Sequence, residues 1–382
     1  MTHSGHHFNH YFTFKSELNE LFASISLRTF AKSLISIFVP IYLITLGYSF
    51  MTAFIFMAVA SACHAIFSYG AAKLSAKIGF KHLIMVSAPF LILYYLLLNS
   101  ITFIQSLGIP VVLIAVFGGT SNAFFWVGYH TDFAKSTTKK NSGKKLGFVR
   151  ILISLASSLG PLVGAFLITR LDFHYAFMIV IGIIILSLIP LLMRKDKHEP
   201  FKFEFKDIRN KFGTRAVVAH MGKGIEASVR TIAWPLFIYF VILDKGITLL
   251  GSVTSLSLLA SLVVTYFVAN HIDKKINFLY KISSFMNAAI WIVRNFVKTY
   301  LAVFIIDALY GVSNTTHTIG FNKICYDKAR KKKMILEYMT IREIIICTTH
   351  TFVYILLGLI NNYNIMFIIA ALGSLMFLAY KE

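Results

Sequence analysis

One long apolar stretch, residues 214–243, carries several side chains that can be charged. It is long enough to cross a bilayer as a helix, which needs about 20 apolar residues. At about 100° per residue, five of its polar or aromatic side chains fall within one arc of about 120°. A charge in mid-bilayer costs about 3 kcal/mol on insertion scales, so such a face is expected to meet a bundle interior or a wet cavity. The five are His220, Lys223, Glu226, Arg230 and Trp234.

This arc has two interpretations. Glu226 lies four residues before Arg230 and three after Lys223, so the three side chains are neighbours on the helix surface. They could simply neutralise one another as a structural network. The alternative is that they line a polar pathway, which the position of Arg230 near the middle of the stretch favours.

Three further apolar stretches carry polar side chains far from their ends. Lys32 lies about ten residues into the first stretch, which is about 15 Å of helix rise. In the other two stretches the polar residues share one helix face. They are expected to bind substrate, except for the carboxylate Asp307, and a structural role stays open for each. They are Asn122, Trp126 and His130 in residues 107–131, and Asp307, Tyr310, Asn314 and His317 in residues 299–322.

Carboxylates inside a membrane are rare and are candidates for carrying protons. Glu226, Asp307 and Glu343 are the three that the sequence offers. Two arginines nearer the ends of apolar stretches, Arg28 and Arg294, are instead expected to reach the membrane interfaces with their long side chains.

The composition is that of an integral membrane protein. Of the 382 residues, 57% are hydrophobic and 14% are charged, whereas a soluble domain carries about 25% charged residues. The mean hydropathy is +0.72. We therefore predict an all-α membrane protein with twelve spans. The spans are 22–46, 49–70, 83–104, 107–131, 148–169, 174–193, 214–243, 247–270, 278–297, 299–322, 335–360 and 363–380.

The distribution of basic residues orients these spans. If the connections alternate between two sides, 28 of the 37 Lys and Arg lie on the side of the two tails and three on the other side. Such a bias marks the cytoplasmic side. We expect both termini in the cytoplasm and the protein in the cell membrane. The net charge of +21 then belongs to loops near lipid headgroups, and no nucleic-acid partner is expected.

No metal site, cofactor or disulfide is predicted. Cys63, Cys325 and Cys347 stand alone, without the spacing of a metal-binding motif. The histidines of residues 1–10 lie in a polar tail without defined ligand geometry. No cleavable signal peptide is recognisable, because the first apolar run follows a polar lead and no small-residue cleavage site follows it.

The chain divides into two halves around a polar run. Residues 194–213 form the longest polar segment between spans and are the expected central loop, after a tail at 1–21. Six spans precede it, in residues 22–193, and six follow, in residues 214–382. The deepest polar residues lie in the first, fourth, seventh and tenth spans, which are positions one and four of each half. A structural ion-pair network has no reason to repeat in this way.

This pattern resembles the major facilitator superfamily, with its two six-helix bundles. The segment AKLSAKIGFKH at 72–82 looks like the signature between the family's second and third helices, with Lys77, Gly79 and Lys81 matching. Ala76 stands where an Asp is expected. The segment VANHIDKKINF looks like a degenerate repeat of it, in which Asp273 and Lys274 match.

A second motif resembles the proton-coupled exporters of that family. The run GPLVG contains Gly160, Pro161 and Gly164 of the fifth-helix motif, but the Arg expected in the fourth helix of those exporters is absent from residues 107–131. In the family the first, fourth, seventh and tenth helices line a central cavity, and two bundles rock about a midplane site.

The resemblance and the polar residues together predict a secondary transporter for a small organic solute. Lys32 and Arg230, one from each half, would bind an anionic or polar substrate, and Trp126, Trp234 and Tyr310 would pack its body. Proton coupling and efflux are expected; proton-coupled or facilitative uptake is the alternative. The protein is expected to be a monomer with substrate, protons and lipid as its partners. A non-transporting sensor or scaffold is a less favoured class, and no Ser–His–Asp or phosphate-loop pattern indicates an enzyme.

Overall fold

The computed structural model describes residues 17–136, 142–192, 196–201 and 212–380. Within these ranges the side chains of 17–19, 142–150, 261 and 263–277 are not described. The described residues form helices and connections, with no strand among them. A helix satisfies its backbone hydrogen bonds internally, which suits a chain whose surroundings offer no water.

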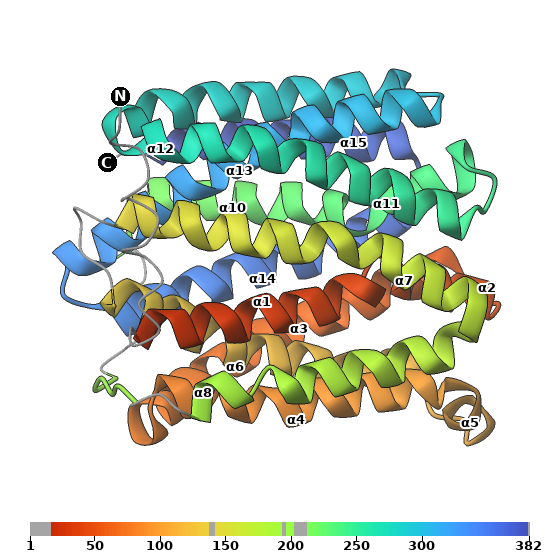
Figure 1. Ribbon diagram of the computed structural model, residues 1–382, viewed down its shortest axis with the longest axis horizontal. Coiled ribbons are helices and arrows are strands. Elements are labelled where there is room, and N and C mark those ends of the chain that lie inside the picture. The colour runs from red at the N-terminus through yellow and green to blue at the C-terminus, as the bar shows by residue number, and fades with distance from the viewer. Residues whose placement is uncertain (1–16, 137–141, 193–195, 202–211, 381–382) are drawn as a thin grey trace, which may run out of the picture.

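The helices of the first half run along the long axis of the molecule (Figure 1). The first predicted span is a helix pair, and the short α5 and η1 cap the connection between the third and fourth spans. The elements are α1 (Glu17–Ile35), α2 (Val39–Thr45), α3 (Phe50–Ile78), α4 (Phe80–Asn99), α5 (Ile101–Ser106), η1 (Val111–Leu113), α6 (Ile114–Lys135), α7 (Ser142–Leu186) and α8 (Ile189–Leu192).

The second half begins with a helix that adopts a π hydrogen-bond pattern twice. Its seventh span consists of α10 (Thr214–Ser228), the π-helix η3 (Val229–Ala233), α11 (Trp234–Phe237) and the π-helix η4 (Ile238–Ile242). The remaining elements are α12 (Ile247–Val293), η5 (Arg294–Phe296), α13 (Tyr300–Lys331), α14 (Ile335–Ile360), α15 (Tyr363–Met376) and η6 (Phe377–Ala379).

The twelve predicted spans all fall on these helices, but two pairs are joined. Helix α7 covers the fifth and sixth spans and bends at Asp172, whose φ is +85°. Helix α12 covers the eighth and ninth spans, and its ribbon doubles back in Figure 1. By length and composition alone, seven described stretches could cross a membrane, and one of them, Ile151–Leu192, contains two predicted spans.

Some predicted boundaries were wrong. Helix α13 continues to Lys331, beyond the predicted end of its span at residue 322. The predicted loop 72–82 is also mostly helical, because α3 ends at Ile78 and α4 begins at Phe80. Lys and Arg are good helix formers, so a basic run at a helix C-terminus extends the helix beyond its apolar part.

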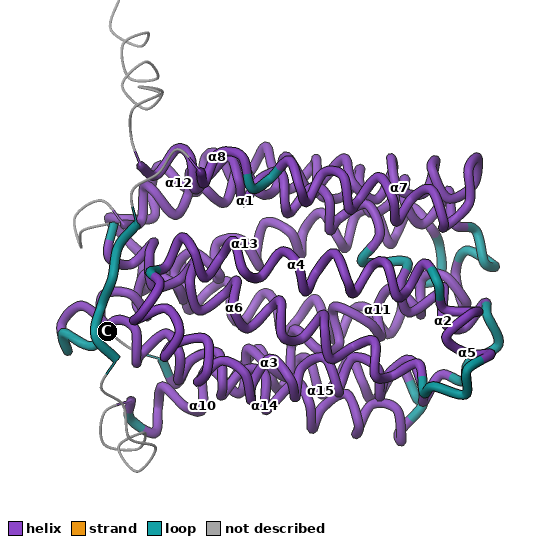
Figure 2. The backbone as a smooth tube through the Cα atoms, turned by 90° about the horizontal axis from the view of Figure 1, so that it is seen from below, coloured by secondary structure: helices purple, strands orange, loops and turns teal. Residues whose placement is uncertain are grey.

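The basic connections lie together at one end of the molecule. The α3–α4 and α13–α14 connections lie at the same end in Figure 1, while α5 and the bend of α7 lie at the other. Figure 2 shows the same separation from below. This arrangement is the one that the alternating charge count predicts; the side of the membrane on which it lies stays a prediction.

Glycines allow two close helix contacts. A Cβ added at Gly164 would lie 1.7 Å from the carbonyl oxygen of Leu34, so α7 packs directly on α1. A Cβ at Gly251 would lie 2.4 Å from the carbonyl oxygen of Pro161, so α12 of the second half packs on α7 of the first. Small residues permit such backbone approaches between membrane helices.

Pro161 also shapes this contact between the halves. Proline inside a helix disturbs the backbone hydrogen bonds around it. Nearby, the backbone N–H of Leu162 donates to Ser255 Oγ on α12 at 2.9 Å. The Ser255 side chain of the second half is therefore the hydrogen-bond acceptor for a backbone N–H group of the first half.

The α3–α4 connection is fastened by a carboxylate from the central loop. Asp196 accepts hydrogen bonds from the backbone N–H groups of Lys81 (2.9 Å) and His82 (3.1 Å), in the first turn of α4. Gly79, with φ +90°, makes the turn, and a Cβ there would lie 2.3 Å from the Asp196 carboxylate. Anions are favourable at a helix N-terminus because the first N–H groups have no partner within the helix.

Candidate functional site

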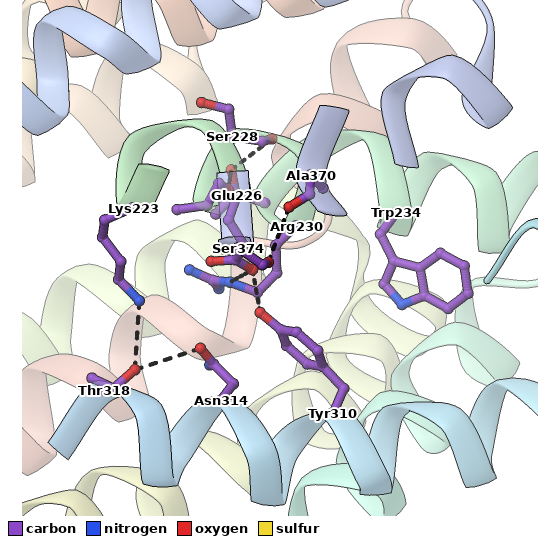
Figure 3. Close-up of polar contacts among 12 residues, drawn as sticks. Lys223, Glu226, Ser228, Arg230, Trp234, Tyr310, Asn314, Thr318, Ala370 and Ser374 are labelled. Carbon is purple, nitrogen blue, oxygen red and sulfur yellow. Dashed lines mark hydrogen bonds and ion pairs between the residues drawn. The ribbon is translucent and has the colours of Figure 1, made fainter. Parts of the chain in front are cut away.

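A carboxylate, a guanidinium and a phenol meet at the middle of the seventh span. Glu226 on α10 is fully buried and accepts a hydrogen bond from the Tyr310 hydroxyl on α13. Arg230 Nε lies 3.4 Å from Glu226 Oε1. The Arg230 side chain is nevertheless 34% exposed, and Figure 3 shows it directed toward α13. An exposed guanidinium inside a helix bundle indicates space for water or a ligand between the helices.

A second amine lies two turns earlier on the same side of this helix. Lys223 Nζ is 3.5 Å from Thr318 Oγ1, which is 3.5 Å from Asn314 Oδ1 (Figure 3). Lys223 and Thr318 are half-buried. Helices α10 and α13, the seventh and tenth spans, therefore present polar groups to each other, as the periodicity predicts.

The π-helix η3 places Arg230 within a widened turn. Single π turns are frequent at functional sites. Pro235 follows at the start of α11 and has no N–H to continue the regular pattern. This proline is the sequence signal that could have indicated the irregularity, which the sequence analysis missed.

Asp307 belongs to an adjoining, largely buried cluster, which shares Tyr310 with the first. It accepts hydrogen bonds from Trp234 Nε1 at 2.9 Å and from Arg294 Nη2 at 2.7 Å. The Arg294 side chain is 1% exposed and its guanidinium lies 4.2 Å from the Trp234 ring centre and 4.4 Å from that of Tyr310. The expectation that Arg294 reaches the interface was wrong, because ring faces and a carboxylate stabilise the cation inside.

The first half contributes Lys32 on α1. Its Nζ donates to Asn122 Oδ1 on α6 at 3.0 Å, and both residues are half-buried. The first and fourth spans thus meet through an amine and a neutral amide. Among the described residues, Lys32 Nζ has this neutral partner and no carboxylate partner.

Arg28 lies one turn before Lys32 and is 3% exposed. It donates to Ser87 Oγ at 3.0 Å and Ser121 Oγ at 2.9 Å, and lies 4.2 Å from the ring centre of Phe125. The expectation that it reaches the interface was wrong as well. The sequence analysis did not include it among the site residues, although it adds a positive charge close to Lys32.

The predicted site residues on α6 and α14 meet across the two halves. His130 Nδ1 is 2.6 Å from the Tyr326 hydroxyl, and its Nε2 is 3.7 Å from Glu343 Oε1. Trp126 stacks on His130 with ring centres 5.2 Å apart. Glu343 also pairs with Arg342. His130 and Glu343 therefore form part of the contact between the halves.

Two predicted histidines lie in aromatic surroundings. His317 is fully buried, with ring centres 4.0 Å from Phe377 and 5.1 Å from Tyr280. His220, part of the polar arc, is also fully buried, and its Nδ1 lies 2.6 Å from the Ala216 carbonyl oxygen. His220 lies six residues before Glu226 on the same helix, and His317 lies seven residues after Tyr310 on α13.

The described motif residues lie at helix ends or in contacts between helices. Lys77 is exposed and Lys81 is buried at the start of α4. A Cβ at Gly160 would lie 1.8 Å from Ser33 Oγ, so this glycine, like Gly164, lets α7 approach α1. Asp273 and Lys274 lie in the part of α12 whose side chains are not described, and the tail histidines lie outside the described residues.

Comparison with known proteins assigns the family. A model of the Major Facilitator Superfamily matches residues 21–341. The chain belongs to the Major Facilitator Superfamily. This membership, together with the folds below, confirms the prediction of an all-α membrane protein with twelve spans in two six-helix bundles. As a member of this superfamily it is a multi-pass membrane protein with the fold of a transporter.

Solved transporters of the superfamily share the fold at low identity. The human organic anion transporter MFSD10 (TETRAN) superposes with a TM-score of 0.72 at 10% identity, over 95% of this chain and 98% of that one. FucP in the outward conformation gives 0.74 at 10%, over 96% and 98%. A form of the E. coli fucose:proton symporter FucP gives 0.69 at 12%, over 95% and 97%. No curated protein sequence matches.

Proposed function

We propose that this superfamily member is a secondary transporter of a small organic anion. The observation that supports this most is the partly exposed Arg230, with the half-buried Lys223 two turns earlier on the same helix, on one half and Lys32 on the other. Lys32 pairs with a neutral amide, so an anionic group would gain more from these cations than a neutral or cationic one. Asn122 and Asn314 offer hydrogen bonds to its polar atoms, while Trp126 and Tyr310 border its body.

Alternating access would use both halves of this site. Residues 22–193 and 214–382 act as two bundles joined by the loop 194–213, and the anion bridges Lys32 of one and Arg230 of the other. The protein works as a monomer in the cell membrane with both termini in the cytoplasm. Binding energy shared between two bodies favours the conformation in which they are close, which is how a ligand selects one state.

Glu226 couples the anion to a proton in this proposal. Its carboxylate is the partner of Arg230 and Tyr310. An incoming anion competes with Glu226 for the guanidinium, and a carboxylate that loses its cation inside a membrane is favoured to take up a proton. A substrate and a proton would then bind together. Asp307 and Glu343, the other predicted carriers, have cationic partners of their own in Arg294 and Arg342.

The first experiment measures anion binding and flux in proteoliposomes. We expect Lys32→Gln and Arg230→Gln each to weaken binding of the transported anion by about tenfold or more, since a charged hydrogen bond contributes about 1.5–3 kcal/mol. Lys298→Gln, which changes an exposed cation in the connection before α13, is the matched control. Unchanged binding in both site variants would contradict an anion site here.

The second experiment addresses coupling. Glu226→Gln should permit anion exchange but abolish the pH dependence of net flux, because the amide cannot change its charge. Asp307→Asn is the comparison. If both variants keep the flux and the pH dependence of the wild-type protein, proton coupling through these residues is wrong.

A further inference from the structure

Three potential metal ligands meet where the two halves touch. His64 lies on α3, and Glu343 and Cys347 lie one turn apart on α14. Their ligand atoms are all within 4.8 Å of one another. The three residues are 7%, 5% and 2% exposed. The ligands come from sequence positions almost 300 residues apart, so no spacing motif could have revealed them.

The histidine nitrogen at this cluster lacks a hydrogen bond. His64 Nε2 is buried and has no hydrogen-bond partner among the described residues, although Glu343 Oε2 lies 3.4 Å away. A buried polar atom without a partner is costly and calls for an explanation. Glu343 Oε1 is already the acceptor for Arg342 Nη1, which leaves Oε2 toward the histidine.

The donor set suits zinc. Imidazole nitrogen, thiolate sulfur and carboxylate oxygen are its protein ligands, at about 2.0–2.3 Å from the metal. Around a tetrahedral ion such ligands lie about 3.3–3.8 Å apart. The separations in this cluster, at most 4.8 Å, therefore need to shrink by up to about 1.5 Å, which changes of side-chain rotamer can supply. His130, with Nε2 3.7 Å from Glu343 Oε1, borders the cluster.

An ion pair between His64 and Glu343 is the simpler explanation of the contact. This ion pair does not account for two observations. Arg342 already balances the charge of Glu343, and the Cys347 thiol lies beside His64 and Glu343. The positive charge of Arg342 also repels a metal cation at this position. Loss of the thiol proton on binding offsets part of this repulsion, because cysteine binds metals as the thiolate.

We propose that His64, Glu343 and Cys347 form a binding site for Zn²⁺ that joins α3 of the first half to α14 of the second. A metal bound there holds the two helices together. If the chain moves its anion by alternating access, as proposed above, the metal inhibits that movement reversibly. Zn²⁺ binding by these three residues does not require that the chain transports an anion.

Binding is tested on the purified full-length chain without an affinity tag. His3, His6, His7 and His10 are replaced by Gln in the full chain to remove the competing tail histidines. Zn²⁺ should then raise the melting temperature, because a ligand that binds the folded state stabilises it, whereas Mg²⁺ should not. Co²⁺ titrated in place of Zn²⁺ should give the absorption band of a thiolate–cobalt bond.

Two variants decide the assignment. Cys347→Ser should abolish the thiolate–cobalt band, and His64→Gln should weaken Zn²⁺ binding at least tenfold. Cys325→Ser, at another buried cysteine in α13, is the matched control and should keep both signals. A zinc shift that persists in both site variants, or a cobalt spectrum without the thiolate band in the parent protein, would overturn the site.

A transport assay separates this inference from the proposed function. Zn²⁺ should inhibit anion flux in the parent protein and not in Cys347→Ser. If zinc binds as described but no anion is transported by any variant, the proposed function fails and the metal site stands. If flux is measurable and zinc does not bind, the metal site fails alone.

Discussion

At the scale of single residues, the membrane interior of this chain holds cations that are stabilised by partners from other helices. Arg28 has two serine hydroxyls and a phenyl ring, and Arg294 has Asp307 and three aromatic rings. Their places along the helices suggested interfacial positions. Their partners lie on other helices, except for Trp291, which is three residues before Arg294 in the same helical stretch. A pattern within one helix does not report the others.

The Arg294–Asp307 pair gives a prediction for stability. Asp307→Asn leaves the buried Arg294 without its counter-charge, and breaking a buried pair costs about 3–5 kcal/mol. We expect a clearly lower melting temperature in detergent, measured by intrinsic fluorescence of Trp234 and its neighbours.

The double variant Arg294→Met with Asp307→Leu serves as the control. Replacing both members of a buried pair with apolar residues is often neutral, so most of the loss should be recovered. An Asp307→Asn protein as stable as the wild type would show that Asp307 is not required by Arg294.

At the scale of elements, hydropathy and charge alternation were sufficient to predict every span. The ends of α3 and α13 were not predictable, because helical hydrogen bonding continues beyond the apolar part when the flanking residues favour it. The π turns at Val229–Ala233 and Ile238–Ile242 were also missed. Apolar periodicity carries no record of one extra residue in a turn.

The α1–α7 contact gives a prediction with an internal control. Gly164→Ala places a methyl group against the backbone of Leu34, where no side chain can move aside. We expect a loss of about 1–3 kcal/mol. Gly182→Ala in the same helix meets open space and should leave the thermal stability unchanged or slightly higher. Equal effects of the two substitutions would contradict the packing described.

The Asp196 carboxylate predicts a pH dependence of stability. Burial raises its pKa, but hydrogen bonds from the backbone of Lys81, His82 and Lys197 and from the His82 side chain together lower the pKa below its ordinary value. A lowered folded-state pKa adds stability that is complete above the unfolded pKa of about 3.9 and is lost as the pH falls through the folded value. Asp196→Ala should therefore cost about 0.5–2 kcal/mol near neutral pH.

Thermal melts from pH 5 to pH 3 check this. The stability difference between the wild type and Asp196→Ala should shrink below about pH 4. Asp196→Asn keeps an acceptor but cannot titrate, so its difference from Asp196→Ala should not vary with pH. If the stability difference between the wild type and Asp196→Ala grew as the pH fell through this range, the lowered pKa of Asp196 would be contradicted.

At the scale of the whole molecule, the sequence predicted which helices pair through polar side chains but not every residue that makes these contacts. The polar residues of the first, fourth, seventh and tenth spans do pair between α1 and α6 and between α10 and α13. His130 shares their face on the helix wheel, yet it contacts the other half through Tyr326. Depth along a helix, which the wheel omits, separates the central residues from those that join the halves.

The His130–Tyr326 hydrogen bond predicts a shift in conformation. Tyr326→Phe removes this hydrogen bond, which must break whenever the two halves separate around His130. Separation of the halves there should therefore become more frequent by about 2- to 10-fold. Labelling of an Ala134→Cys probe in a background without other cysteines reports that opening. Tyr338→Phe, whose hydroxyl contacts Tyr380 within the second half, should not change the labelling rate.

The contact of Gly251 with Pro161 and Ala165 has a mechanical consequence. No long side chain is interposed between α7 and α12 there, so the two backbones can tilt about this point without any rotamer having to change. If the two halves move by alternating access, as proposed, this contact is a pivot: it stays in place while the helix ends on either side of it move in opposite directions.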